Sequence, residues 1–145
     1  MPVVHVIADE QINECWPVMR QLRPHLKESE FCGLVKRQMS EGYRLSYVRE
    51  EGNVMAVTGY RILHNLAWGR FCYVDDLITA EEHRSKGHGA ELLRYLRKFC
   101  VEQRCERLEL DSGVQRKDAH RFYLREGMEI SSHHFSQRIQ PGTTG

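Results

Sequence analysis

The stretch HRSKGHGAELLRYL, from His83 to Leu96, decides how this chain folds. Gly87 and Gly89 stand two residues apart, and a helical pattern of leucines begins directly after them. Glycine lets a ligand approach the main chain closely, because it carries no Cβ. The start of a helix also presents unpaired N–H groups and the positive end of the helix dipole. This combination predicts a loop that binds phosphate.

Two common phosphate-binding loops do not fit these residues. A P-loop requires GxxxxGK[ST], which the chain lacks, and a dinucleotide-binding loop requires a third glycine where Leu92 stands. Arg84, Lys86 and His88 add positive charge around the glycines. On these residues alone, a tight turn that holds no ligand stays open as the alternative.

The segments around the loop predict a single α/β domain of residues 1–145, with 137–145 as a C-terminal tail. Alternating or continuous apolar runs predict strands over residues 3–8, 43–50, 54–63, 70–79 and 107–112, and a last strand or pair of strands over 128–139. Helical spacing predicts helices that follow Asp9, cover Glu28 to Met39, follow the loop and cover Asp118 to Glu126. Asp9 is expected to cap the first helix. This order predicts a mixed sheet flanked by helices.

Composition and charge exclude several classes of protein. The net charge is +1, so no global field attracts nucleic acid. No apolar run has the length of a membrane span, and the N-terminus lacks the pattern of a signal peptide, so we expect a cytoplasmic protein without a membrane partner. The five cysteines form no CxxC pair, which predicts reduced thiols. No Cys/His cluster has the spacing of a zinc site, so we expect no metal.

Two motifs occur in order in the second half of the chain. RSKGHGA, from Arg84 to Ala90, resembles the R/Q-x-x-G-x-G/A motif of the GNAT superfamily of N-acetyltransferases, and it follows the strand VDDLIT. DAHRFYLREGM, from Asp118 to Met128, resembles that family's N-x-x-x-x-F-Y-x-x-x-G-F, with Asp for Asn and Met for an aromatic residue. The resemblance in element order covers residues 3–139. It implies the GNAT fold: a mostly antiparallel sheet of six to seven strands, splayed between the fourth and fifth, with about four helices.

The same resemblance implies that acetyl-CoA is the cosubstrate and that its acetyl group passes to a primary amine of a small molecule by direct attack in a ternary complex. The pyrophosphate would rest on the amides of the glycine loop, the pantetheine arm would lie along the strand before it, and Arg116, Lys117 and Arg121 would meet the phosphates. The residues implied to hold acetyl-CoA are Leu77, Ile78, Thr79, Arg84, Ser85, Lys86, Gly87, His88, Gly89, Ala90, Asp118, Ala119 and Phe122.

The proposed transfer needs a proton acceptor and a proton donor. An alkylammonium has a pKa near 10.4, so a base that removes its proton is useful at neutral pH. Asp76 is the first candidate, with Glu81 and His134 in reserve, whereas Asp75 would point to the other face of a regular strand. The family match assigns the donor to the hydroxyl of Tyr123, which spacing alone would favour as a core aromatic. A backbone N–H near Leu77 would stabilise the oxyanion.

The acceptor is the least determined part of the reaction. Tyr60, His64, Trp68, Asp75 and His134 are candidates for contact with it, although ordinary packing or exposure explains each of them as well. The segment from residue 116 to 138 resembles the aminoalkylphosphonate N-acetyltransferase branch, and amino acids, polyamines and amino sugars stay open. A non-catalytic acyl-CoA sensor on the same fold is the alternative function. Homodimers are frequent in the family, so a homodimer is a further expectation.

Overall fold

The computed structural model describes residues 3–143 as two compact units, residues 3–110 and 111–143. The first unit contains, in chain order, β1 (Val3–His5), α1 (Asp9–Leu22), α2 (Glu28–Met39), β2 (Arg44–Glu50), β3 (Asn53–Asn65), β4 (Gly69–Thr79), the 3₁₀ turn η1 (Glu81–His83), α3 (His88–Glu102) and β5 (Arg107–Leu110). The second unit contains α4 (Lys117–Arg125) and a segment without regular structure. That the whole chain is one domain stays a prediction.

One mixed sheet organises the first unit, with its strands in the order β1-β2-β3-β4-β5. The first four pair antiparallel, and β5 pairs parallel to β4, which confirms the mixed, mostly antiparallel sheet. The predicted count of six to seven strands is wrong for the described residues, which form five. The difference lies in residues 128–139, which form no strand there, because β-propensity yields a strand only where a neighbouring strand pairs with it.

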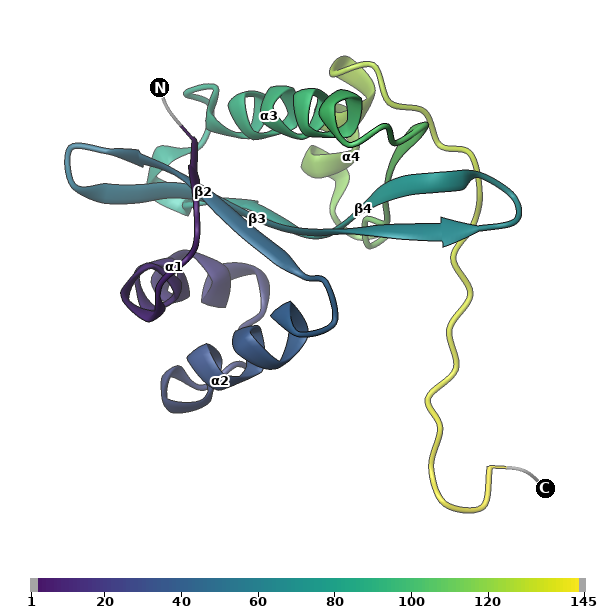
Figure 1. The fold of residues 1–145 in the computed structure, drawn as a ribbon, viewed down its shortest axis with the longest axis horizontal. Helices are drawn as coiled ribbons and strands as arrows, with labels where there is room; N and C mark the ends of the chain where they lie inside the picture. Colours follow the sequence, from purple (N-terminus) through teal and green to yellow (C-terminus); the bar gives the residue numbers. More distant parts are fainter. Residues whose placement is uncertain (1–2, 144–145) are drawn as a thin grey trace. The chain divides into compact units, whose positions relative to one another are not determined.

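Helices cover both faces of this sheet (Figure 1). Helices α1 and α2 lie on one face and α3 lies on the other. The apolar stripe of α1 and α2 packs with β2, β3 and β4 in a buried cluster that includes Ile12, Phe31 and Leu45. On the other face of the sheet, the apolar stripe of α3 buries Leu92, Leu93 and Leu96. The helical spacing in the sequence therefore marked the residues that face the sheet.

The N-cap of the first helix lies one residue before the residue that the sequence predicted. Ala8 is the N-cap and Asp9 is the first helical residue, so the expectation that Asp9 caps the helix is wrong. Instead, the Gln11 side-chain oxygen accepts hydrogen bonds from the N–H groups of Ile7 and Ala8, at 2.7 and 3.0 Å. Asp9 in the first turn still favours the helix through its charge at the positive end of the dipole.

Candidate functional site

The glycine loop is a concave run of backbone between η1 and α3. Ser85 and Gly87 have φ angles of 66° and 87° and flank Lys86, and Gly87 is the N-cap of α3. Alternation of left-handed residues with ordinary ones turns successive N–H groups toward one side, which makes an anion-binding nest. A left-handed serine costs on the order of 1 kcal/mol, and such strain is concentrated at functional sites.

The donors of this loop are left free by the helix that follows. The first helical hydrogen bond runs from the N–H of Glu91 to the carbonyl of Gly87, so the N–H groups of residues 88–90 have no acceptor within α3. Arg84 and Lys86 are exposed beside them. The loop thus combines backbone donors, the positive end of a 15-residue helix and two cationic side chains.

His88 differs from the other basic residues of the loop. Its side chain is buried, with Nε2 3.7 Å from Oε2 of Glu50, at the end of β2. Nε2 is buried and makes no hydrogen bond within the described residues. The sequence predicted that this imidazole adds positive charge around the loop. In the structure the side chain is buried, so only the backbone N–H of His88 can donate to an anion bound in the loop.

Strand β4 loses one of its two neighbours before it reaches the loop. Its ladder with β5 runs from the Phe71–Arg107 pair to the Val74–Leu110 pair and ends there. From Asp76 to Thr79, among the described residues, β4 pairs only with β3, and Asp75 is in register with neither neighbour. This confirms the predicted splay. It leaves the backbone of these five residues with an edge that can accept an extended ligand as if it were a strand.

A β-bulge changes the direction of the two aspartates on β4. The register with β3 passes from the Gly59–Asp76 pair to the Tyr60–Val74 pair, so Asp75 is the extra residue. The prediction that Asp75 and Asp76 point to opposite faces is wrong, because it assumed a regular strand. An extra residue breaks the alternation of a strand, and both carboxylates here bond to side chains on the α1–α2 side of the sheet.

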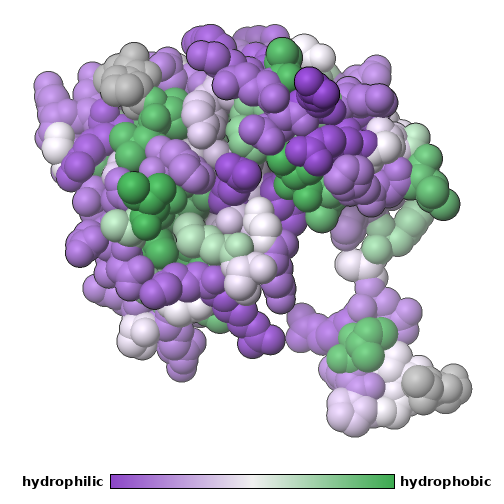
Figure 2. All heavy atoms as spheres, viewed as in Figure 1, coloured by the Kyte–Doolittle hydropathy of each residue, from purple (hydrophilic) through white to green (hydrophobic). Residues whose placement is uncertain are grey.

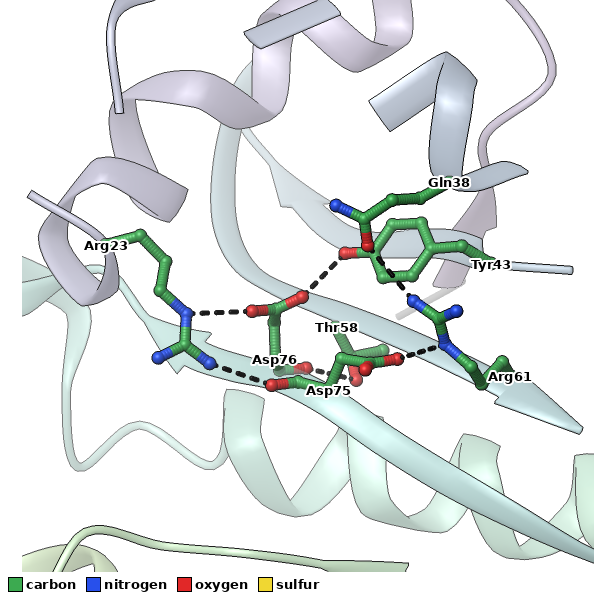
Figure 3. Close-up of polar contacts among 7 residues, drawn as sticks. All are labelled: Arg23, Gln38, Tyr43, Thr58, Arg61, Asp75 and Asp76. Atoms are coloured by element: carbon green, nitrogen blue, oxygen red, sulfur yellow. Dashed lines mark hydrogen bonds and ion pairs between the residues drawn. The ribbon is translucent and has the colours of Figure 1, made fainter. Parts of the chain in front are cut away.

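The Asp76 carboxylate is fixed by two donors from different elements (Figure 3). Its Oδ1 accepts from Nε of Arg23, just after α1, at 3.0 Å, and its Oδ2 accepts from the hydroxyl of Tyr43, just before β2, at 2.7 Å. Only 14% of the Asp76 side chain is exposed. Burial and the neighbouring Asp76 carboxylate raise the pKa of Tyr43 well above its usual value, so the phenol keeps its proton and acts as a donor.

The neighbouring carboxylate, that of Asp75, has different hydrogen-bond partners. Its Oδ2 accepts from Nε of Arg61 at 2.8 Å, and Arg61 also donates to Oε1 of Gln38 on α2 (Figure 3). Burial raises the pKa of the Asp75 carboxyl above 3.8, and the Arg61 guanidinium opposes that effect only in part. Asp75 therefore takes up a proton more readily than an ordinary aspartate.

The bulge is held by side chains that the sequence reading missed. The carbonyl of Asp75 accepts from Nη2 of Arg23, and the carbonyl of Asp76 accepts from the Thr58 hydroxyl, both at 2.9 Å. A Cβ on Gly59 would lie 1.7 Å from the Tyr43 hydroxyl oxygen. Gly59 is thus required by the close approach of that phenol. A glycine inside the apolar strand VMAVTGYRIL was the signal that could have indicated such an approach.

Comparisons with known proteins agree with this geometry. The Acetyltransferase (GNAT) family matches residues 8–128. The chain belongs to the GNAT family of acetyltransferases. Over 134 residues it is 33% identical to the uncharacterized N-acetyltransferase YhdJ of Bacillus subtilis, covering 91% of this chain and 94% of that one. It is also 31% identical over 77 residues to the aminoalkylphosphonate N-acetyltransferase of Salmonella typhimurium, covering 53% of this chain and 49% of that enzyme.

Solved structures share the GNAT fold at low sequence identity. A ribosomal-protein-alanine N-acetyltransferase from Brucella melitensis has a TM-score of 0.81 and 16% identity, with 96% of this chain and 100% of that one covered. The aminoglycoside N-acetyltransferase AAC(6')-Iy in complex with CoA has a TM-score of 0.85 and 10% identity, with 96% and 94% covered. At such identities, the likeness concerns the fold of this GNAT chain.

Three residues expected to line the acceptor pocket lie elsewhere in this GNAT sheet. Tyr60 is 0% exposed and bonds through its hydroxyl to Ser46 and Tyr95, so it has no surface to offer a ligand. His64 pairs with Arg70, six residues along β4 from Asp76, which is about 20 Å in a strand. Trp68 follows in the β3–β4 turn and packs edge-on against Phe71. The structure therefore does not bring these three to the carboxylate pair.

The second GNAT motif lies in the unit of residues 111–143. Asp118, Ala119, Phe122 and Tyr123 are on α4, where the ring centroids of Phe122 and Tyr123 are 5.3 Å apart. Burial raises the pKa of the Tyr123 hydroxyl, and Arg116 opposes this effect, so the phenol holds its proton at neutral pH. His134 follows α4 in a segment without regular structure, and its Nδ1 lies 3.4 Å from Oδ1 of Asp111.

Neither a metal-binding cluster nor a membrane-spanning helix occurs among the described residues. Within residues 3–143, no three His, Cys, Asp or Glu side chains come together in a way that could hold a metal ion. No helix among those residues has both the length and the apolar character needed to cross a membrane.

Proposed function

We propose that this chain transfers the acetyl group of acetyl-CoA to the primary amine of a small molecule within a ternary complex. The observation that carries the proposal is the nest at the start of α3, directly after a β4 edge that lacks a strand partner from Asp75 to Thr79. A diphosphate matches the nest and an extended amide-bearing arm matches the edge, and CoA contains both. Membership of the GNAT family and the CoA complex of a structural neighbour support this choice.

The chain's own groups would hold the cosubstrate in three ways. Backbone N–H groups between Arg84 and Ala90 would bind the diphosphate, with Arg84 and Lys86 adding charge. Backbone groups of Leu77, Ile78 and Thr79 would pair with the pantetheine arm. In the second unit, the basic residues Arg116, Lys117 and Arg121 are candidates for the remaining phosphate.

The chemistry requires that the attacking nitrogen be unprotonated. We propose that Asp75 accepts the ammonium proton, because burial already raises the pKa of its carboxyl, and that Asp76, held by Arg23 and Tyr43, orients the positive amine. The nitrogen then forms a bond to the thioester carbonyl carbon, the carbon–sulfur bond breaks, and the leaving thiolate takes a proton from Tyr123. The new amide nitrogen releases its second proton to solvent, and solvent also restores the Tyr123 hydroxyl and removes the proton held by Asp75. Asp76, the sequence-based candidate for the base, thus acts here as the orienting charge.

Replacement of each aspartate by asparagine should separate these roles. We expect Asp75→Asn to lower kcat by about 10²–10⁴-fold, the usual contribution of a general base, and to abolish the acidic limb of the pH profile. Wild-type activity should rise with pH through that limb, since Asp75 must be ionised, and the limb lies above the ordinary aspartate value of 3.8. Asp76→Asn should instead raise KM for the amine. Steady-state kinetics against pH measures both effects.

Asp9→Asn is the matched control, because Asp9 is also paired with a cation, Lys36 at 3.3 Å, but is exposed at the start of α1. Its kinetics should equal those of the wild type. An acidic limb that survives in Asp75→Asn would assign the base to another group.

Tyr123→Phe should lower turnover more than it lowers acetyl-CoA affinity, because it removes a proton donor and keeps the ring. We expect kcat to fall by about 10²-fold with the KM for acetyl-CoA within about twofold. Tyr95→Phe is the control, since the Tyr95 hydroxyl bonds to Tyr60 and Ser46 and lies in no proposed site. Equal turnover in Tyr123→Phe and the wild type would remove Tyr123 from the chemistry.

The acceptor class can be tested by an amine screen. Thiol release from acetyl-CoA should be measured with aminoalkylphosphonates, amino acids, polyamines and amino sugars, and with no amine as the blank. Aminoalkylphosphonates enter the screen because one relative is named for them. Amine-dependent thiol release with any of these classes supports an N-acetyltransferase. Tight acetyl-CoA binding without turnover across the whole screen would favour a non-catalytic sensor instead.

A further inference from the structure

Three of the five free thiols meet where α3 ends against the sheet. Cys72 is on β4, Cys100 is in the last turn of α3, and Cys105 follows in the connection to β5, all within the unit of residues 3–110. The Cys100 side chain makes hydrogen bonds with those of Cys72 and Cys105, so Cys100 is the middle thiol of the three. The acetyl transfer proposed above uses none of these residues.

The end of α3 fixes the contact between Cys100 and Cys105. The N–H of Cys105 donates to the carbonyl of Cys100 at 2.8 Å. The N–H of Arg104, whose φ of 59° is left-handed, donates to the carbonyl of Val101 at 3.2 Å. These two bonds and this backbone conformation make a Schellman motif, in which the side chains at the two ends come into contact. The motif therefore holds Cys100 and Cys105 in the proximity that a disulfide requires.

Arg70, on β4, holds this turn in place. Its Nε donates to the carbonyl of Gln103 at 2.7 Å, and its own carbonyl accepts from the N–H of Glu106 at 2.8 Å. The Arg70 side chain also makes a hydrogen bond with the Cys105 thiol. The turn is thus tied to β4 on both sides of Cys105, which keeps this thiol beside Cys100.

The three thiols differ in how readily they ionise. A hydrogen bond from Cys72 lowers the pKa of the Cys100 thiol, burial opposes this effect, and a hydrogen bond from Cys105 adds to it. The hydrogen bond to Cys100 and burial raise the pKa of Cys72, and burial raises the pKa of Cys105. Because the thiolate is the reactive form, Cys100 is the thiol of the three that reacts first with an oxidant.

The two thiols at the end of α3 are also the two that a small reagent can reach. Cys100 is 7% exposed and Cys105 is half-buried, whereas Cys72 is 0% exposed. The face of the molecule drawn in Figure 2 is largely hydrophilic, so a reagent dissolved in water can approach such a surface closely. A small hydroperoxide, such as hydrogen peroxide, is an oxidant of this kind.

We propose that Cys100 and Cys105 form a peroxide-reactive pair, in which Cys100 is oxidised first and Cys105 converts the product to a disulfide. The Cys100 thiolate attacks one oxygen of the hydroperoxide. An S–O bond forms, the O–O bond breaks, and the other oxygen leaves as water or an alcohol with the proton that Cys100 had released to solvent. The Cys105 thiol then attacks the Cys100 sulfur. The S–S bond forms, the S–O bond breaks, and the hydroxyl leaves as water with the Cys105 proton.

This sequence of steps keeps the oxidation of Cys100 reversible. The two thiols lose two electrons and the hydroperoxide gains them, and a dithiol returns the disulfide to two thiols. A sulfenic acid that meets no second thiol is oxidised further to a sulfinic acid, which such reductants do not reverse. A sulfinate at Cys100 would also bury a charge between α3 and β4. We therefore expect Cys105 to protect the end of α3 from irreversible oxidation.

Mass spectrometry of the full-length chain after treatment with hydrogen peroxide identifies the bond. Trypsin cleaves after Lys98, Arg104 and Arg107, so a disulfide would join the peptide of residues 99–104 to that of residues 105–107. We expect this joined pair, and its separation by dithiothreitol. Cys32, half-buried on α2, is the internal control and should be oxidised at least about tenfold more slowly.

Two results with the wild type would overturn the proposal. One is a chain in which Cys100 and Cys105 stay reduced while Cys32 is oxidised. The other is a disulfide that joins Cys100 to Cys72, which would leave Cys105 without the role given to it. Neither result depends on whether a substituted chain folds.

Cys105→Ser tests the protective role. Without the second thiol, Cys100 should accumulate a sulfenic acid, which dimedone traps, and then a sulfinic acid as the peroxide concentration rises. Cys32→Ser is the matched control, because it removes a half-buried thiol elsewhere and should still give the disulfide. If Cys105→Ser and the wild type form equal amounts of sulfinic acid, Cys105 does not protect Cys100.

Cys72 variants test the hydrogen bond that favours the Cys100 thiolate. Cys72→Val removes the donor and keeps an apolar side chain that suits a strand, so it should slow the oxidation of Cys100 about tenfold, the effect of one ordinary hydrogen bond. Cys72→Ser keeps a donor and should restore most of the rate. The melting temperature of each variant without peroxide shows whether it is folded. A folded Cys72→Val that reacts at the wild-type rate would contradict the activation of Cys100 by Cys72.

Discussion

Gly59→Ala should destabilise the protein by about 3 kcal/mol, because the new Cβ would displace the Tyr43 ring. A Cβ at this position would lie 1.7 Å from the hydroxyl oxygen and 2.3 Å from Cζ of that ring, well inside contact distance. Displacement breaks the bond from Tyr43 to Asp76, and a hydrogen bond to a charged group is worth about 1.5–3 kcal/mol, with overpacking strain of a similar size. Thermal melts should show a loss of about 6–12 °C.

Two comparisons isolate this cause. Gly33→Ala is the matched control, since no atom lies within 4 Å of its Cβ position on α2, and it should stabilise the helix by about 0.5–1 kcal/mol. Tyr43→Leu removes the three side-chain atoms that the Cβ would meet, so Gly59→Ala should cost under about 1 kcal/mol in that background. A melting temperature for Gly59→Ala that matches the wild type would show that Tyr43 does not need this glycine.

Gly59→Ala should also affect the reaction. Tyr43 is one of only two donors that the described structure gives to the Asp76 carboxylate, so its displacement frees the proposed orienting charge. We expect a higher KM for the amine and little change in acetyl-CoA affinity, because the glycine loop is not involved.

Gly89→Trp should weaken acetyl-CoA binding by about 100-fold or more. Gly89 is in the first turn of α3, where the helix leaves three N–H groups without an internal acceptor, and an indole there would occupy the space of the diphosphate. A 100-fold loss corresponds to about 2.7 kcal/mol, the size of one or two charge-assisted hydrogen bonds. Isothermal titration of the variant with acetyl-CoA measures it.

Gly33→Trp controls for the effect of a large aromatic residue on an exposed helix glycine and should bind acetyl-CoA like the wild type. The melting temperature of Gly89→Trp without ligand shows whether the variant is folded. A folded Gly89→Trp with unchanged affinity would contradict the position given to the phosphates.

The elements of the fold were largely predictable, because their signals are local. The helix from Glu28 to Met39 has the predicted bounds, and the strands at residues 44–50 and 69–79 lie within a residue of those expected. Capping and periodicity depend on neighbouring residues, which a sequence displays directly. The glycine loop belongs to the same class, since two glycines before a leucine stripe specify a turn into a helix.

The sequence indicated Asp75 and Asp76 as candidate functional residues, but it did not predict that their side chains lie on the same face of the sheet or which residues contact them. Whether Asp75 and Asp76 share a face depends on the register between β3 and β4, and the alternation of side chains within one strand does not encode a bulge. Arg23 and Tyr43 lie 53 and 33 residues before Asp76, so no local pattern connects them to it. The burial of Tyr60 was hidden from the sequence for a similar reason, because the Tyr60 hydroxyl bonds to Tyr95, on a helix that comes later in the chain.

The most direct test of the account compares two ligands that share the acetylated thiol arm, of which only acetyl-CoA carries the diphosphate and its phosphorylated adenosine. Wild-type protein should be titrated by calorimetry with acetyl-CoA and with acetyl-pantetheine, and its melting temperature should be followed with each. We predict one acetyl-CoA per chain, a raised melting temperature, and binding of acetyl-pantetheine that is at least about 100-fold weaker. Equal affinity for the two ligands, or neither heat nor a melting shift with acetyl-CoA, would contradict a site built on the backbone donors at the start of α3.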